Sequence, residues 1–334
     1  MVMYSFFVGI DVSKETLDVA YYAMSKPRYA GQFSNQIAGF RNMIRELKKV
    51  TSAVPEDWFI CFENTGTYSK TLLNWLFSQG IACREENALT IHKSKGLQRG
   101  KDDKIDARVI CQYLYLHREK LAPTKPTNPA IYQLKKLLSR RNLLVRKKSA
   151  LQVSLKEQRK EYDPDIYRFL VKQNNQLLDM IQQQIKQVEQ LINKLIKKDP
   201  KLEDQYNLIQ SVKGIGPIIA AYLLAYTENF ARFKNARKFA CYCGIAPFPN
   251  SSGKTLKGKN KVSHMANKQI KALLTNGANA AVRWDNEMNL YYHKKIGEGK
   301  EYGTVINAIK NKIVARAFAV VSRRTPYVCL ATYA

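Results

Sequence analysis

The stretch from Ala130 to Lys198 constrains the fold more than any other part of the chain. It contains no glycine and is rich in Leu, Ile, Gln, Lys and Arg. Asp163-Pro164 divides it, because proline favours the first turn of a helix and disfavours the interior. Each half can form a helix of roughly 45–50 Å. The sequence therefore predicts two long helices between an N-terminal and a C-terminal part.

The second of these predicted helices carries a repeating apolar pattern. Its members follow the 3–4 spacing of a coiled-coil seam with one polar position. They are Leu177, Ile181, Gln184, Val188, Leu191 and Leu195. Two interpretations stay open, a helical hairpin packed within one chain and a coil that joins chains into a dimer or tetramer, because fewer than about four heptads are available.

The N-terminal part shows short strand-like and helix-like patterns in turn. Strands are predicted over 4–10, 17–22, 29–34, 58–62 and 81–84, and helices over 40–50, 72–77 and 105–116. The order β-β-β-α-β-α-β-α predicts a mixed sheet covered by helices. This is the element order of a ribonuclease-H-like domain.

The C-terminal part, from Leu202 onward, is mainly helical in pattern and includes one basic, glycine-containing loop over 250–263. The expected fold class is thus α/β plus all-α. The expected domains are an α/β domain over 1–125, a long helical coiled-coil region over 126–200 and a mainly helical domain over 201–334.

Charge is distributed very unevenly along the chain. Residues 1–110 carry 15 basic and 12 acidic side chains, whereas residues 111–334 carry 40 and 15. The formal net charge of +28 makes a polyanion the natural partner. No segment approaches the ~18–20 apolar residues of a membrane span. The N-terminus lacks the features of a secretion signal, so a cytoplasmic protein that does not enter membranes is expected.

Acidic residues fall at predicted strand ends and at a predicted helix start. Asp11 lies at the end of the first strand, Glu63 just past the fourth, and Asp103 and Asp106 near the start of the last helix. In the predicted fold these four carboxylates can converge in one cleft, where they would repel one another unless a cation lay between them. Hard oxygen ligands select Mg²⁺ or Mn²⁺, and two such ions about 3.5–4 Å apart support phosphodiester chemistry.

Each of these acids also has an ordinary structural interpretation. A strand-end aspartate commonly forms a turn, and acids in a first helical turn are favoured by the helix dipole. Asp102 competes with Asp103, since Asp102 and Asp106 are also neighbours on a helix. Six cysteines without a C-x-x-C pair and four scattered histidines give no support for a zinc site.

Two further segments have the composition of phosphate contacts. In the first, small residues that include Ser251 and Ser252 lead into a run of lysines, which are Lys254, Lys257, Lys259 and Lys261. Backbone amides of such a loop can approach a phosphate, and the lysines can neutralise charge. In the second, Lys213, Gly214 and Gly216 precede a helix that begins at Pro217. A flexible surface loop and an ordinary helix start explain the same residues without nucleic acid.

At this point the chain resembles a known family. Its motifs Gly9-Ile10-Asp11-Val12-Ser13-Lys14, Phe62-Glu63-Asn64-Thr65-Gly66 and Lys101-Asp102-Asp103-Lys104-Ile105-Asp106-Ala107 are similar to the three signatures of the DEDD insertion-sequence transposases. The N-terminal domain of that family resembles the RuvC resolvase. The resemblance implies that Asp11, Glu63, Asp103 and Asp106 are catalytic and bind the metal.

The C-terminal part resembles the same family in its G-x-x-P run, its Ser-Gly pair and the basic residues that follow. The resemblance implies a catalytic serine that forms a covalent phosphoserine link to DNA. Ser252 is the match, with Ser251 as the alternative. It also implies a structured bridge RNA that pairs with donor and target DNA. One departure is Ser263-His264-Met265-Ala266, where the family often has Ser-Lys-x-Gly.

Two other functions stay open at this stage. The first is a RuvC-like, structure-specific nuclease in which the carboxylates suffice. The second is a nucleic-acid-binding protein without catalysis. A covalent protein–DNA adduct separates a transposase from the nuclease, and metal-dependent strand cleavage separates both enzymes from the binding protein.

Overall fold

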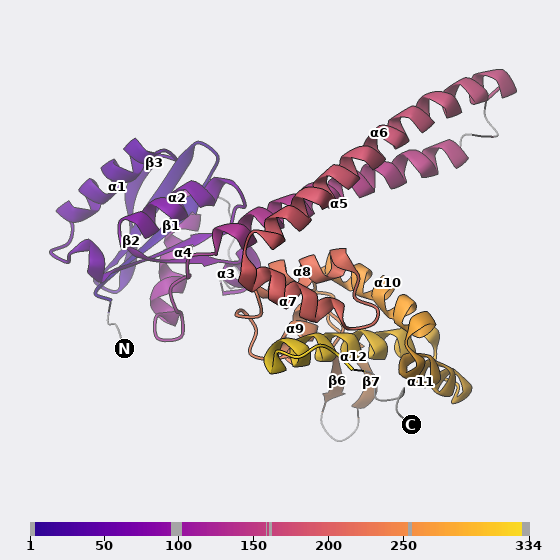
Figure 1. Ribbon diagram of the computed structural model, residues 1–334. Coiled ribbons are helices and arrows are strands. Elements are labelled where there is room, and N and C mark those ends of the chain that lie inside the picture. Colours follow the sequence, from indigo (N-terminus) through magenta and orange to yellow (C-terminus); the bar gives the residue numbers. More distant parts are fainter. Residues whose placement is uncertain (1–3, 95–101, 158, 160–161, 253–255, 329–334) are drawn as a thin grey trace. The chain divides into compact units, whose positions relative to one another are not determined.

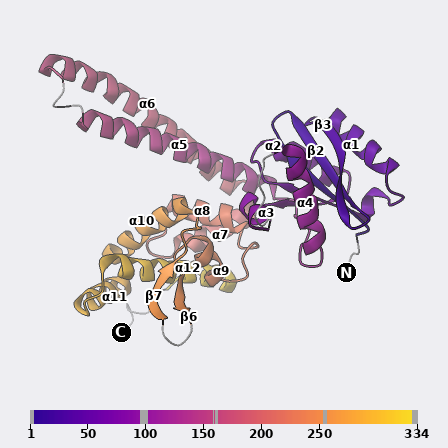
Figure 2. The same ribbon diagram turned by 180° about the vertical axis from the view of Figure 1, so that it is seen from behind.

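The computed structural model describes residues 4–94, 102–157, 159, 162–252 and 256–328. The chain divides into two compact units, Met1–Pro126 and Thr127–Ala334. Unit 1 contains a mixed sheet with helices, and unit 2 consists of helices and one β-hairpin, as Figures 1 and 2 show from opposite sides. The mixed α/β character agrees with the predicted fold class.

Five strands of unit 1 form one sheet in the order β3-β2-β1-β4-β5. They are β1 (Phe6–Val12), β2 (Thr16–Ala23), β3 (Lys26–Ser34), β4 (Trp58–Glu63) and β5 (Ala82–Glu86). The first three strands pair antiparallel, whereas β4 runs parallel to both β1 and β5. This sheet is consistent with the ribonuclease-H-like domain predicted from the sequence.

Helices cover both faces of this sheet. They are α1 (Ile37–Lys49), α2 (Tyr68–Ser78), α3 (Ala88–Ser94) and α4 (Asp103–His117). Phe40 and Leu72 of α1 and α2 pack in one core with Ile10, whereas Val109 of α4 packs in a second core with Phe7. Alternate residues of β1 thus serve opposite cores. The predicted strands and helices occur in the predicted order, and α3 is an addition.

Unit 2 begins with two long helices, α5 (Pro129–Glu157) and α6 (Pro164–Lys197), which lie side by side in Figures 1 and 2. Pro164 occupies the first turn of α6, as predicted. Arg141 Nε donates to Glu189 Oε1 at 2.6 Å, and Lys148 Nζ donates to Gln182 Oε1 at 2.7 Å. The two helices therefore form a hairpin within one chain.

The buried side of α6 differs from the predicted seam. Ile185 and Ile192 are buried, whereas Leu177, Gln184 and Leu191 of the predicted seam are exposed. The other seam members, Ile181, Val188 and Leu195, are half-buried. As a seam within one chain the prediction was therefore wrong at half of its positions, whereas a seam between chains stays a prediction. A straight α-helix has 3.6 residues per turn and drifts away from a strict 3.5-residue repeat.

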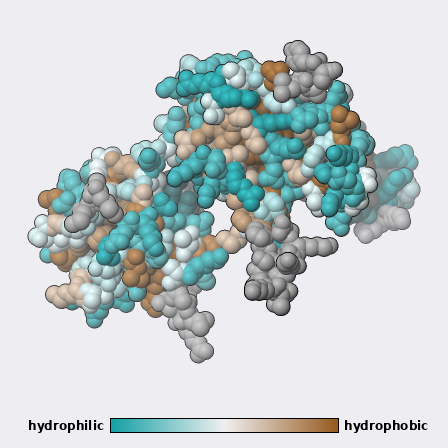
Figure 3. Space-filling view, turned by 90° about the horizontal axis from the view of Figure 1, so that it is seen from below, coloured by the Kyte–Doolittle hydropathy of each residue, from teal (hydrophilic) through white to brown (hydrophobic). Residues whose placement is uncertain are grey.

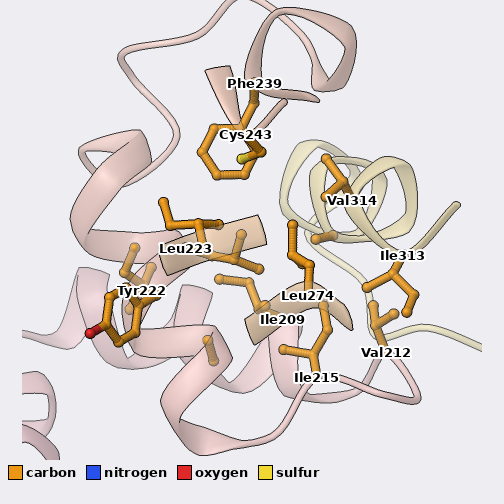
Figure 4. Close-up of a cluster of buried hydrophobic side chains, with 14 of the residues drawn as sticks. Ile209, Val212, Ile215, Tyr222, Leu223, Phe239, Cys243, Leu274, Ile313 and Val314 are labelled. Atoms are coloured by element: carbon orange, nitrogen blue, oxygen red, sulfur yellow. The ribbon is translucent and has the colours of Figure 1, made fainter. Parts of the chain in front are cut away.

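The remaining helices of unit 2 surround a single hydrophobic core. They are α7 (Pro200–Gln210), α8 (Pro217–Thr227), α9 (Ala236–Tyr242), α10 (Lys268–Trp284), α11 (Asn286–Gly297) and α12 (Tyr302–Arg323). Leu223 of α8, Leu274 of α10 and Ile313 of α12 meet in this core (Figure 4). Leu138 of α5 and Ile192 of α6 join it, so the base of the helical hairpin is part of the same core.

Among the described residues, no helix has the length and apolar character that crossing a membrane requires. Hydrophilic side chains predominate on the face drawn in Figure 3, where apolar side chains form smaller patches.

Candidate active site

Asp11 is the penultimate residue of β1, and its side chain is half-buried. Burial, followed by the negative charges of Asp106, Asp103, Glu63 and Asp18, raises the pKa of Asp11 from 3.8 to about 6. Carboxylates act on one another in this way only at short range. The other three predicted acids, Glu63, Asp103 and Asp106, therefore lie within electrostatic range of Asp11.

Glu63 lies beside Asp11 because β1 and β4 are parallel neighbours. Ile10 pairs in register with Phe62. The next residue on each strand, Asp11 and Glu63, therefore stands at the same carboxyl-terminal edge of the sheet. Glu63 is the last residue of β4, whereas the sequence predicts it just past the end of that strand.

Helix α4 lies directly against β1 at Gly9. A Cβ atom added to Gly9 would stand 2.2 Å from the backbone nitrogen of Cys111 and 2.6 Å from the carbonyl oxygen of Ala107. Only glycine permits an approach this close. Because Ala107 directly follows Asp106, this contact sets the distance between Asp11 and the acids of α4.

Asp102 and Asp103 hold different positions at the start of α4. Asp102 is the N-cap residue, and its Oδ1 accepts a hydrogen bond from Lys104 N at 3.1 Å. Asp103 is the first residue of the helix and is one of the charges that raise the pKa of Asp11. These positions favour Asp103 over Asp102 as the functional acid.

A further acid, Asp18, lies opposite Asp11 and was not predicted from the sequence. The register of β1 and β2 pairs the two residues, and only 2% of Asp18 is exposed. Tyr29 Oη donates to Asp18 Oδ1 at 2.6 Å, and Gln32 Nε2 donates to Oδ2 at 3.0 Å. Aspartate is uncommon inside strands. Its presence within the predicted strand over 17–22 was the available signal.

The carboxylate set fits a hard divalent cation such as Mg²⁺ or Mn²⁺. Burial and then repulsion by the neighbouring acids raise the pKa of Asp11, and a cation between the acids would relieve the repulsion. In the part of the chain that the structure describes, no three His, Cys, Asp or Glu side chains stand as a group that could hold an ion.

The segment predicted as a loop over 250–263 is largely a β-hairpin, so that prediction was wrong. It consists of β6 (Pro247–Ser252) paired antiparallel with β7 (Leu256–Val262). Its glycines and lysines have low strand propensity, which cross-strand pairing overrides here. The register shifts between Phe248 and Asn250, at Pro249, which has no amide hydrogen to donate.

Both candidate serines lie near the tip of this hairpin. Ser252 is the last residue of β6 and pairs with Leu256, whereas Ser251 pairs with Lys257. The two serines hold consecutive positions of β6. The predicted basic residues Lys257, Lys259 and Lys261 all lie in β7. Lys254 lies outside the described residues.

The second predicted nucleic-acid contact is a tight turn before α8. Gly214 has a φ of +89°, and a Cβ atom there would stand 2.5 Å from the carbonyl oxygen of Gly277 in α10. Packing therefore explains Gly214 without a ligand. Lys213 and Gly216 are exposed, and Gly216 is the N-cap residue of α8. A role of Lys213, Gly214 and Gly216 in nucleic-acid binding stays a prediction.

Two family models match the chain. One, described as the transposase IS116/IS110/IS902 family, matches residues 206–293, which include the serine hairpin. The other, a transposase model of the DEDD IS110 type, matches residues 8–164. The second match includes the four acids around Asp11.

Individual relatives extend the similarity to nearly the whole chain. The pilin gene-inverting protein of Moraxella bovis is 27% identical over 332 residues, which are 96% of this chain and 97% of that protein. The protein of the same name from Moraxella lacunata is 26% identical over the same share of each chain. An uncharacterized 44.8 kDa protein of insertion element IS116 from Streptomyces clavuligerus is 28% identical over 31% of this chain and 26% of its own length.

Proposed function

The chain belongs to the IS116/IS110/IS902 family of DEDD transposases, and from this membership we propose that it cleaves and rejoins DNA with a metal site in unit 1 and a serine nucleophile in unit 2. The observation that carries the proposal is the group of acids around Asp11, whose pKa is about 6. Besides burial, the charges of Asp106, Asp103 and Glu63 act on Asp11. The β1–β4 register and the close contact of α4 with Gly9 bring the elements that carry these acids to one strand end.

Asp11, Glu63, Asp103 and Asp106 would hold Mg²⁺ or Mn²⁺. Such ions, when bound, activate a nucleophilic oxygen and stabilise the oxygen that leaves phosphorus. Asp18 contributes a further negative charge, fixed by the hydrogen bonds from Tyr29 and Gln32. Asp18 therefore acts as a positioning residue beside Asp11.

Ser252 would attack a phosphodiester of DNA. Its Oγ forms a bond to phosphorus, the bond from phosphorus to one deoxyribose oxygen breaks, and the proton lost by the serine ends on that oxygen. The product is a phosphoserine ester and a free DNA hydroxyl. Attack by such a hydroxyl on the ester then restores Ser252 and joins the strands.

We further propose that a structured bridge RNA guides the reaction by pairing with donor and target DNA. Its support is the family resemblance, together with the 40 basic and 15 acidic side chains of residues 111–334. RNA co-purified with the full-length protein and sequenced should contain one discrete structured species. Recovery of only random cellular RNA would contradict guidance.

The direct test of the proposed chemistry is incubation of the protein with labelled DNA, with and without a divalent ion. Metal-dependent cleavage and a protein–DNA adduct stable in denaturing gels are expected. Cleavage without an adduct would favour a RuvC-like nuclease, and binding without cleavage would favour a non-catalytic binding protein.

The full-length similarity to two pilin gene-inverting proteins suggests a second role with the same chemistry. Cleavage and rejoining at two sites in one DNA molecule inverts the segment between them. A plasmid with both sites in inverted orientation would reveal inversion as a changed restriction pattern, whereas transposition places the segment in a second plasmid.

Nucleic-acid affinity is expected to fall steeply as salt rises. Each neutralised phosphate releases counterions and makes the slope of log K against log salt more negative by about 0.9. Residues 111–334 carry 40 basic side chains against 15 acidic ones, so several phosphate contacts are expected. Fluorescence anisotropy between about 50 and 200 mM salt measures the slope. An affinity that does not change with salt would contradict electrostatic binding to phosphates.

We also propose that the chain works as a homo-oligomer, a dimer or a tetramer, with contacts along α6. Leu177 and Leu191 are 46% and 52% exposed, and Met180 is 58% exposed. Replacing Leu177 and Leu191 together by glutamate should yield a smaller species in light scattering, because burial of an unpaired charge is costly. The same pair replaced by glutamine is the milder control. An unchanged mass for the glutamate variant would place the oligomer contact elsewhere.

A further inference from the structure

Unit 2 contains a cavity of about 750 Å³ at the base of the β6–β7 hairpin, beside α10 and α12. Basic side chains line it from separate elements, namely Lys261 of β7, His264, Lys271 of α10 and Lys310 of α12. Among its lining residues in the described part of the chain, none is an aspartate or a glutamate. Such a lining attracts an anion.

Lys310 differs from the other basic residues because it is buried, with 5% of its surface exposed. Its Nζ donates to Thr275 Oγ1 at 3.4 Å, a long hydrogen bond. Burial and then the charge of Lys271 lower the pKa of Lys310. A buried ammonium group held near other cations destabilises a fold, so packing alone does not explain a lysine here.

The wall that carries Lys310 is firmly attached to the hairpin base. Asn307 Nδ2 and Asn311 Nδ2 both donate to the carbonyl oxygen of Ile245, at 2.7 and 2.9 Å. Ile245 lies two residues before β6, and both asparagines line the cavity. Lys310 therefore holds a defined position relative to the hairpin that carries the serines.

We propose that this cavity binds a phosphate group of a nucleic-acid backbone, with Lys310 and Lys271 as its inner cations and Lys261 and His264 at its exposed rim. Lysine ammonium groups bind phosphate as point charges. No phenylalanine, tyrosine or tryptophan is among the described lining residues, so the cavity lacks the large aromatic rings on which bases commonly stack. Its chemistry therefore suits the backbone of DNA or RNA.

The position of the cavity suggests which phosphate it holds. Pro247 pairs with Val262 at the hairpin base, and Ser252 ends the same strand near the tip. At about 3.3 Å per residue the two ends of β6 are roughly 17 Å apart, the length of about five stacked nucleotides. This step rests on the proposed function: if Ser252 receives the cleaved phosphate, the cavity holds one about five nucleotides away.

The test compares Lys310→Met with Lys294→Met in the full-length protein. Both changes remove one positive charge, but Lys294 lies exposed on α11 and is not among the residues that line the cavity. Anisotropy with labelled DNA and, separately, labelled RNA should show a loss of roughly tenfold or more for Lys310→Met with one polymer. The slope of log K against log salt should become less steep by about 1. Whichever polymer loses affinity is the ligand of the cavity.

Thermal unfolding separates a binding role from a structural one. Lys310→Met should be at least as stable as the unchanged protein, because it removes a buried charge that lies near other cations. If Lys310→Met does not fold, Lys271→Gln at the half-buried neighbour should show the same loss of affinity and of salt slope. Equal losses for Lys310→Met and Lys294→Met, or unchanged affinity for both polymers with Lys310→Met and Lys271→Gln, would overturn the proposal.

A neutral methylphosphonate placed at single positions of the DNA or RNA strand locates the contact. One position should weaken binding to the unchanged protein and have no effect on Lys310→Met. Absence of any such position would also overturn the proposal. Because this readout is binding, it holds even if Ser252 proves not to be the nucleophile, and only the spacing of about five nucleotides would then fall.

Discussion

Replacing Asp11 by asparagine is expected to lower metal-dependent DNA cleavage by roughly 10³-fold or more, about 4 kcal/mol of transition-state stabilisation. Glu63→Gln and Asp106→Asn should have the same effect, because loss of one charged ligand disables the whole metal site. Each variant should remain folded. Burial and neighbouring charges raise the pKa of Asp11 to about 6, so its ionised form opposes folding at neutral pH and its removal relieves repulsion.

The start of α4 offers a matched control for this prediction. Asp102→Ala removes the N-cap hydrogen bond to Lys104 N and should cost about 0.5–2 kcal/mol of stability while cleavage persists. Asp103→Ala should show the reverse, with stability retained and cleavage lost. Thermal unfolding and cleavage rates measured on both variants decide the assignment. Wild-type cleavage by Asp11→Asn, Glu63→Gln or Asp106→Asn would remove the acid site from the mechanism.

Ser252→Ala is expected to abolish the covalent protein–DNA adduct and strand rejoining while RNA and DNA still bind. A serine hydroxyl needs a base, a metal or a positive field to attack phosphorus. We expect the lysines of β7 to supply the field, and the proposed metal site belongs to unit 1. Labelled DNA that stays with the protein in a denaturing gel measures the adduct. Ser251→Ala is the matched control and should keep much of the activity.

Mixing two inactive variants tests whether the active site is shared between subunits. A Ser252→Ala chain still has the acids, and an Asp11→Asn chain still has the serine. Recovery of recombination in the mixture is expected if one subunit supplies the serine and another the metal site. An adduct formed by Ser252→Ala but not by Ser251→Ala would make Ser251 the nucleophile. Recombination by the double serine variant would leave the nuclease interpretation in place.

The sheet of unit 1 was predictable because its strands alternate between two cores and its helices are long enough to show periodicity. The acids Asp11 and Glu63 could be found because strand ends of a parallel pair meet at one edge. The short helix α3 spans only seven residues and shows no recognisable period. Asp18 was missed because burial of a polar side chain depends on partners from another strand, Tyr29 and Gln32.

Features of unit 2 were harder to predict for two physical reasons. The β6–β7 hairpin forms through cross-strand pairing among residues with low strand propensity, so local composition suggested a loop. The buried side of α6 depends on small drifts of helical phase. Ile185 and Ile192 are therefore buried, whereas Gln184 and Leu191 of the predicted seam are exposed. Lys310 gave no sequence signal at all, because its burial depends on how α12 packs beside the hairpin base.

The close contact at Gly9 affects how mutational data on unit 1 should be interpreted. Any side chain at this position would meet the backbone of α4 at Cys111 and Ala107 and displace the helix that carries Asp103 and Asp106. A screen that scores activity alone would then rank Gly9 with the catalytic residues, although glycine has no side chain that could take part in chemistry. Residues of this kind mark where the spacing of an active site is fixed, and a saturation map of unit 1 would show them as a second class of inactive positions.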